Sequence, residues 1–268
     1  MTAAPIGVGV DGTLPSDWIA AFANLAEASG YGSFWYSVRP GPVDPFVTLR
    51  GVVERTDRVP IGISAFPLDA YPAADVSRRL ADARLPLERI IVGVAAGQAK
   101  RGALHLVEGG VAALRAALPG ARVGVGAIGP QMLALAGRVG DAVLVIWLTP
   151  ERLAWSREQV ASGARRAGRR TPDLYLYHRA ARGADGLARI QAEMAIYRQW
   201  PVHKRHQAAM GRPSLIGVAA DDPTDVARHL GPYLSECTLI LRPLPGDVHD
   251  KDEWESLIQF FAPGAARG

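Results

Sequence analysis

The sequence of 268 residues has little cysteine, little lysine and no long apolar segment. Its single cysteine, Cys237, cannot form a disulfide within the chain, so we expect a reducing, cytoplasmic location. The longest purely apolar run, 142–148, is far shorter than the roughly 20 residues that a membrane-spanning helix needs. The N-terminus also has no basic stretch followed by an apolar one, so neither a signal peptide nor a membrane partner is predicted.

Lysine occurs only at positions 100, 204 and 251, so nearly all of the 30 basic residues are arginine, and the formal net charge is +4. The arginines are spread among acids along helix-like segments, with no basic cluster and no reader motif, which argues against nucleic-acid binding. HExxH and CxxC are absent. The close histidine pair, His203 and His206, has no cysteine or carboxylate beside it, so we expect a solvated surface and no metal site.

Short apolar runs alternate with longer amphipathic ones along the whole chain. The short runs predict strands over 6–10, 33–37, 59–64, 90–94, 123–127, 142–146, 174–178 and 238–241, with an extra short strand over 215–218. The longer runs predict helices over 17–29, 45–55, 74–85, 111–118, 130–138, 150–167, 187–198, 224–230 and 254–261.

Apolar strands that alternate with helices indicate a parallel sheet covered on both faces. Eight such units in this length predict a closed (β/α)8 TIM barrel of class α/β. The rival, a doubly wound open sheet, usually has a GxGxxG first turn, whereas the sequence here reads DGTLPSD. No linker or composition break interrupts residues 1–268, so we expect one domain with an excursion near residues 199–214.

Active sites of such barrels lie at the C-terminal ends of the strands. Acids are scarce there, and Asp11 is the main one. Basic side chains gather at these ends: Arg39, Lys100, Arg101, His178, Arg179 and Arg242. Because arginine binds phosphate and carboxylate through two hydrogen bonds, such a mouth would attract anions. The residues that we expect to hold substrate or an anionic group are Asp11, Arg39, Lys100, Arg101 and His178.

Two further patterns leave alternatives open. Residues 126–130, Gly-Ala-Ile-Gly-Pro, lead from a strand into a helix whose unpaired N–H groups would suit a phosphate. Gly-Pro pairs also often simply begin helices. Tyr175 and Tyr177 share one face of their strand, which fits either core packing or a flat aromatic ligand above them.

The stretch 123–169 resembles the bacterial luciferase-like family of flavin- and deazaflavin-dependent oxidoreductases. The motifs that carry the resemblance are Gly126, Gly129-Pro130, Leu135-Ala136-Gly137, Gly140-Asp141 and Thr149-Pro150-Glu151. Segments 26–36, 44–62, 88–97 and 217–243 resemble the family as well. The resemblance implies a (β/α)8 barrel that binds coenzyme F420 or FMN at its mouth and transfers a hydride to or from a small organic substrate. It also suggests a homodimer.

The resemblance implies that the flat ring lies at Ser64–Ala65, where family members often have a non-prolyl cis peptide, and that the phosphate lies near the ends of the fifth and sixth strands. The implied cofactor-binding residues are Ser64, Ala65, Gly97, Gln98, Gly126, Ala127, Ile128, Gly129, Trp147 and Arg242.

Two departures from the family matter for chemistry. Val38-Arg39 stands where many deazaflavin-dependent members have Asp-His, and Gln98 stands where sugar-oxidising members have glutamate. Neither arginine nor glutamine can act as a general base near neutral pH, so no catalytic residue is assigned. The alternative is a catalytically degenerate barrel that serves as a cofactor-binding or partner protein. A phosphate-handling aldolase or isomerase is disfavoured, because the strand ends show no lysine in an apolar strand and no carboxylate pair.

Overall fold

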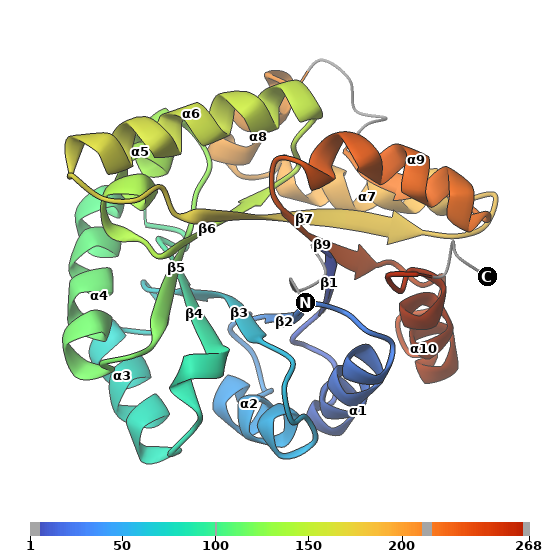
Figure 1. Ribbon diagram of the computed structural model, residues 1–268, viewed down its shortest axis with the longest axis horizontal. Helices are drawn as coiled ribbons and strands as arrows, with labels where there is room; N and C mark the ends of the chain where they lie inside the picture. Colours follow the sequence, from blue (N-terminus) through green and yellow to red (C-terminus); the bar gives the residue numbers. More distant parts are fainter. Residues whose placement is uncertain (1–5, 100, 211–215, 265–268) are drawn as a thin grey trace.

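A closed ring of parallel strands forms the centre of the molecule and confirms the predicted TIM barrel (Figure 1). The computed structural model describes residues 6–99, 101–210 and 216–264. Within these residues the ring consists of β1 (Ile6–Val10), β2 (Phe34–Ser37), β3 (Ile61–Pro67), β4 (Ile90–Ala95), β5 (Arg122–Gly126), β6 (Ala142–Ile146), β7 (Asp173–Ala181) and β9 (Thr238–Pro243). Each strand pairs in parallel with its neighbour, and the β6–β7, β7–β9 and β9–β1 pairings close the ring.

Helices surround the ring of strands, as Figure 1 shows. They are α1 (Ser16–Ala28), α2 (Pro45–Glu54), α3 (Ala73–Asp82), α4 (Ala103–Ala117), α5 (Pro130–Val139), α6 (Pro150–Arg166), α7 (Gly186–Tyr197), α8 (Pro201–Ala208), α9 (Pro223–Leu234) and α10 (Lys251–Phe260), with a 3-10 turn over Leu87–Arg89. Several begin with proline after a capping side chain. Thr149 caps α6 and Asp222 caps α9, each accepting a backbone N–H, which explains where these helices start.

Large side chains fill the lower part of the ring and leave its mouth open. Trp35, Tyr175 and Ile240 pack together there as one buried apolar cluster. The Trp35 ring fits because Gly62 faces it: a Cβ at that position would lie 2.0 Å from the ring. The interior is therefore a packed core below the C-terminal ends of the strands, and any ligand has to bind above it.

Among the boundaries that differ from the predicted ones, three are informative. Helix α4 begins at Ala103, eight residues before the predicted start, because Gly109 and Gly110 lie within the helix instead of preceding it. Helix α9 runs to Leu234 through Pro232, beyond the predicted end at 230. Strand β7 continues to Ala181 because its last residues pair with β8 (Gly217–Ala219), which lies outside the ring.

The segment between β7 and β8 contains the region predicted as an excursion. Residues 201–208 of it form helix α8, which the sequence patterns did not predict, with Pro201 in the first turn. Residues 211–214 of the predicted excursion lie outside the described residues. In the part of the chain that the structure describes, no helix is both long and apolar enough to cross a membrane.

Candidate active site

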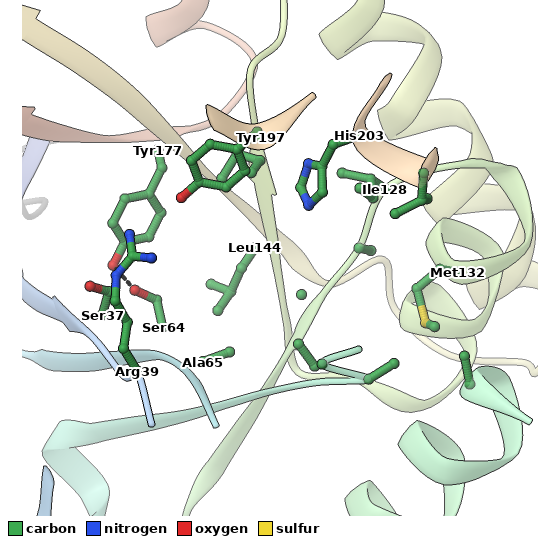
Figure 2. A pocket seen from close by; sticks show the side chains of 18 of the residues that line it. Ser37, Arg39, Ser64, Ala65, Ile128, Met132, Leu144, Tyr177, Tyr197 and His203 are labelled. Carbon is green, nitrogen blue, oxygen red and sulfur yellow. Dashed lines mark hydrogen bonds between the residues drawn. The ribbon is translucent and has the colours of Figure 1, made fainter. Parts of the chain in front are cut away.

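A pocket of about 430 Å³ opens at the C-terminal ends of the strands (Figure 2). Its lining is mostly apolar, and it includes residues from seven strands of the ring and from α4, α5, α7 and α8. The lining residues are Ser37, Arg39, Ser64, Ala65, Ala95, Ala96, Gly97, Ala99, Ala103, Gly126, Ala127, Ile128, Met132, Leu144, Ile146, Tyr177, Arg179, Tyr197, Val202, His203 and Arg242. A concave, largely apolar site with a few convergent polar groups is the usual form of a small-molecule site.

One end of the pocket carries three hydroxyl groups, from Ser37, Ser64 and Tyr177 (Figure 2). The Ser64 and Tyr177 hydroxyls are hydrogen-bonded to each other, and Ser37 Oγ accepts the backbone N–H of Gly12 at 3.2 Å. The Ser64–Ala65 peptide bond is cis, as the resemblance implied. Burial raises the pKa of Tyr177, so its hydroxyl stays protonated and can donate a hydrogen bond.

The other end of the pocket lies where β5 leads into α5, beside Ile128 and Met132. No side chain of the described residues caps α5, so its first backbone N–H groups lack a side-chain acceptor. Gly129, just before the helix, has φ +81°, and a Cβ there would meet no atom within 4 Å. This helix start therefore combines free donors with open space, which suits a phosphate group.

Buried charged groups connect the mouth of the barrel to α7. Glu193 on α7 binds Arg179, with 2.9 Å between Oε1 and Nη2, and also binds Arg242. Asp11 Oδ2 lies 2.7 Å from Arg242 Nη2 and 3.4 Å from Arg39 Nε. We call these five side chains the arginine–carboxylate cluster. Burial alone would raise the pKa of Glu193, but the guanidinium groups of Arg179 and Arg242 outweigh it and lower the pKa to about 2.

Helices α7 and α8 place Tyr197 and His203 over the pocket (Figure 2). The two ring centroids are 5.0 Å apart, in an edge-to-face arrangement, and the Trp200 ring lies 5.8 Å from His203. Burial lowers the pKa of His203 to about 4, and the nearby His206 and Arg179 add to the effect. No carboxylate lines the pocket within the described chain, and the lowered pKa of His203 keeps its imidazole neutral near pH 7, so that the ring can accept a hydrogen bond.

The structure brings together eight of the residues singled out from the sequence. Those that line the pocket are Arg39, Ser64, Ala65, Gly97, Gly126, Ala127, Ile128 and Arg242. Gly129 stands next to them at the start of α5. Asp11 forms ion pairs with Arg39 and Arg242. Trp147 is buried against Arg179, whose Cζ lies 4.0 Å from the centroid of the indole ring. Asp11 and Trp147 therefore contact residues that line the pocket.

Three of the described candidates, Gln98, Arg101 and His178, are not brought into the pocket. Gln98 and Arg101 are exposed, and the Gln98 backbone N–H donates to Asp69. Lys100 lies outside the described residues. His178 faces away from the pocket, into the layer between β7 and α9, with 3.1 Å between its Nε2 and that of His229. Its neighbour Tyr177 points inward, and strand alternation therefore directs His178 outward.

Other expectations about this region need correction. His206 was expected at a solvated surface, but it is buried, and its Nε2 lies 2.9 Å from the Ile146 carbonyl oxygen. His203 lines the pocket instead of a solvated face. Tyr197 and Glu193 were missed altogether and His203 was assigned to the surface, because no strand-end rule points to the helices between β7 and β8. For β7, the sequence did offer a signal: Tyr175, Tyr177 and Arg179 stand at alternate positions and therefore share one face of the strand.

Comparisons with known proteins bear on this site. The family model described as luciferase-like monooxygenase matches residues 101–215. The chain is also similar to a 5,10-methylenetetrahydromethanopterin reductase of Methanolobus tindarius, with 28% identity over 192 residues. That match covers 58% of this chain and 59% of the relative, so the chain spans less than two thirds of the relative's length.

Solved structures share the fold at low sequence identity. An F420-dependent secondary alcohol dehydrogenase in complex with an F420–acetone adduct has a TM-score of 0.78 and 15% identity, over 96% of this chain and 99% of that one. The coenzyme F420-dependent tetrahydromethanopterin reductase of Methanopyrus kandleri has a TM-score of 0.71 and 15% identity, over 96% of each chain. The FMN complex of the oxygenating constituent of 3,6-diketocamphane monooxygenase, from Pseudomonas putida, has a TM-score of 0.66 and 14% identity, over 97% of this chain and 98% of that one. The resemblance to luciferase-like proteins that the motifs predicted is therefore confirmed, together with the fold.

Proposed function

We propose that this chain is an oxidoreductase that binds coenzyme F420 or FMN in the pocket and transfers a hydride to or from a small organic substrate. The observation that carries the proposal is the apolar pocket over Ser64–Ala65, with hydroxyl groups at one end and the uncapped start of α5 at the other. The similarity to luciferase-like monooxygenases supports it, as do the F420 and FMN named for the structural neighbours.

The residues present fit a flat, phosphorylated cofactor. Ala65 and Leu144 would contact the ring, because they offer small or apolar surface in the middle of the pocket. The backbone of Ala127, Ile128 and Gly129 and the start of α5 would hold the phosphate. When bound, the ring supplies the hydride donor or acceptor.

The chain's own side chains would orient the substrate. The Ser64 and Tyr177 hydroxyls, hydrogen-bonded to each other at one end of the pocket, can hydrogen-bond a substrate oxygen. The His203 imidazole, kept neutral near pH 7 by its lowered pKa, can accept a hydrogen bond from a donor group of the substrate. Tyr197 and Val202 would reduce access of water from above.

The alternative proposal is a degenerate barrel that binds a cofactor without turnover. Arg39 and Gln98 favour it, because neither side chain can act as a base and Gln98 is exposed outside the pocket. Cofactor binding without any oxidation or reduction, across a panel of reductants and acceptors, would support this alternative over the enzyme.

The experiment is an absorbance titration of the purified protein with FMN and with F420. We expect saturable binding at micromolar concentrations to at least one of them. In Met132→Trp, an indole ring would fill the α5 end of the pocket, so we expect at least tenfold weaker binding. Val47→Trp, at an exposed position of α2, is the matched control and should bind like the wild type. Failure of both cofactors to bind would overturn the proposal.

Further parts of the proposal concern the domain organisation, the oligomeric state, the location and the kind of ligand. We propose a single domain over residues 1–268, a homodimer and a cytoplasmic location, with small molecules and not nucleic acid as ligands. Sedimentation equilibrium at several protein concentrations tests the dimer, since a monomeric mass at all of them would exclude it.

A further inference from the structure

The arginine–carboxylate cluster does not balance its own charge. It contains three guanidinium groups, Arg39, Arg179 and Arg242, and two carboxylates, Asp11 and Glu193. Glu193 is shared by Arg179 and Arg242. Asp11 Oδ1 is occupied by the backbone N–H and hydroxyl of Thr13, and its other oxygen is shared by two arginines. Burial by itself would raise the pKa of Asp11, but Arg242 and Arg39 outweigh it and lower the pKa, so the cluster carries one net positive charge at neutral pH.

The excess charge belongs to Arg39. The side chains of Arg179 and Arg242 are only 3% and 9% exposed, whereas that of Arg39 is 41% exposed. Among the described residues its ion pairing is limited to Asp11, through Nε at 3.4 Å. Figure 2 shows Arg39 at the end of the pocket that also holds Ser37, Ser64 and Tyr177, and all four residues line the pocket. The guanidinium and the hydroxyl groups therefore belong to the same end of the pocket.

We propose that this corner, formed by Arg39 with the Ser64–Tyr177 hydroxyl pair, binds a carboxylate group of the substrate. The two terminal nitrogens of Arg39 match the two oxygens of a carboxylate, and a hydroxyl group supplies a further donor. One bound carboxylate brings the net charge of the cluster to zero. This inference deepens the proposed function and rests on it for the identity of the ligand as a substrate.

Two sources of the anionic group need to be distinguished. A carboxylate on the substrate would bind at the Arg39 corner together with a cofactor whose phosphate lies at the α5 end. An anionic group of the cofactor itself would instead compete with any added carboxylate. The two cases give opposite results when a small carboxylate is titrated into protein already saturated with cofactor.

The probe is benzoate, measured by isothermal titration calorimetry at low ionic strength, with neutral benzamide as its isosteric control. We expect benzoate to bind at least tenfold more tightly than benzamide, a difference of about 1.4 kcal/mol. Arg39→Gln should weaken benzoate binding at least tenfold, and Arg39→Lys should give an intermediate value because it keeps the charge but loses the two-donor geometry. Arg58→Gln is the matched control, since Arg58 is 89% exposed and precedes β3, at the other end of the barrel. It should change the affinity less than twofold.

Cofactor-saturated protein should bind benzoate as tightly as free protein, and Arg39→Gln should leave cofactor affinity unchanged. Equal binding of benzoate and benzamide, or equal benzoate affinity in wild type and Arg39→Gln, would overturn the site. Displacement of benzoate by the cofactor, together with weaker cofactor binding in Arg39→Gln, would overturn its assignment to the substrate. If neither cofactor binds, the proposed function fails separately, and the benzoate comparison on the free protein still decides whether the corner is an anion site.

Discussion

Removing the negative charge of Glu193 tests whether the arginine–carboxylate cluster stabilises the fold. In Glu193→Gln, Arg179 and Arg242 remain buried without their shared carboxylate. Breaking one partner of a buried ion pair typically costs about 3–5 kcal/mol. The pKa gives a second value: lowering it from 4.5 to about 2 corresponds to about 3 kcal/mol. We therefore expect Glu193→Gln to lower the free energy of unfolding by about 3 kcal/mol at pH 7.

The stabilisation by Glu193 depends on pH. The pKa of Glu193 is lower in the folded protein than in the unfolded chain. Its stabilisation is therefore fully present above pH 4.5 and is lost as the pH falls toward 2. We expect the difference in free energy of unfolding between wild type and Glu193→Gln to shrink by about 2 kcal/mol between pH 6 and pH 3.

Urea denaturation followed by tryptophan fluorescence, at steps of pH from 7 to 3, measures both quantities. Glu108→Gln is the control, because Glu108 pairs with Arg138 at 3.1 Å on the surface and both side chains are more than 40% exposed. A surface pair of this kind contributes at most about 1 kcal/mol. A Glu193→Gln effect as small as that of Glu108→Gln, or a wild-type advantage that stays constant down to pH 3, would refute the reasoning.

Three further predictions concern the pocket and the helix layer. The His203 imidazole should titrate with a pKa of about 4, because burial disfavours its charged form. NMR spectra at steps of pH measure this pKa, and the signal of His203 is identified by its absence in His203→Gln. A pKa near 6.5 would contradict the buried position of the ring. Tyr177→Phe removes the hydrogen bond to Ser64 and should lower the free energy of unfolding by about 1 kcal/mol in urea denaturation, whereas an unchanged value would argue against that bond. Gly137→Ala should lower the free energy of unfolding by about 1–3 kcal/mol in the same assay, because the added Cβ would lie 2.0 Å from the Val160 carbonyl oxygen. The control is Gly109→Ala on α4, where a Cβ meets no atom within 4 Å and should not destabilise the protein. Equal effects of the two variants would show that α5 and α6 can move apart.

The barrel could be predicted because its signals are local. Strand β6 has the bounds predicted from its apolar run 142–146, and proline and capping residues mark the starts of α5 and α6. Such patterns depend on a few neighbouring residues and repeat along the chain. The start of α4 was missed because it precedes two glycines, which usually argue against a helix interior.

The site was predictable only where it follows strand ends. That rule found Arg39, Ser64 and Arg242, which line the pocket. It misplaced His178, because the strand was predicted to end there, whereas β7 continues to Ala181 and alternation turns the side chain outward. It also missed Glu193, whose role depends on how α7 packs against the barrel and not on any sequence spacing.

Strand β7 belongs to the ring through β6 and β9 and also carries β8 as an outer neighbour. The chain between β7 and β8 includes α7 and α8, which contribute Tyr197, Val202 and His203 to the pocket lining, while the ring closes through β9 without them (Figure 1). This single connection can therefore be exchanged without changing the ring. Hybrid proteins that carry the corresponding connection of a related barrel offer a direct way to change ligand preference while the barrel stays the same.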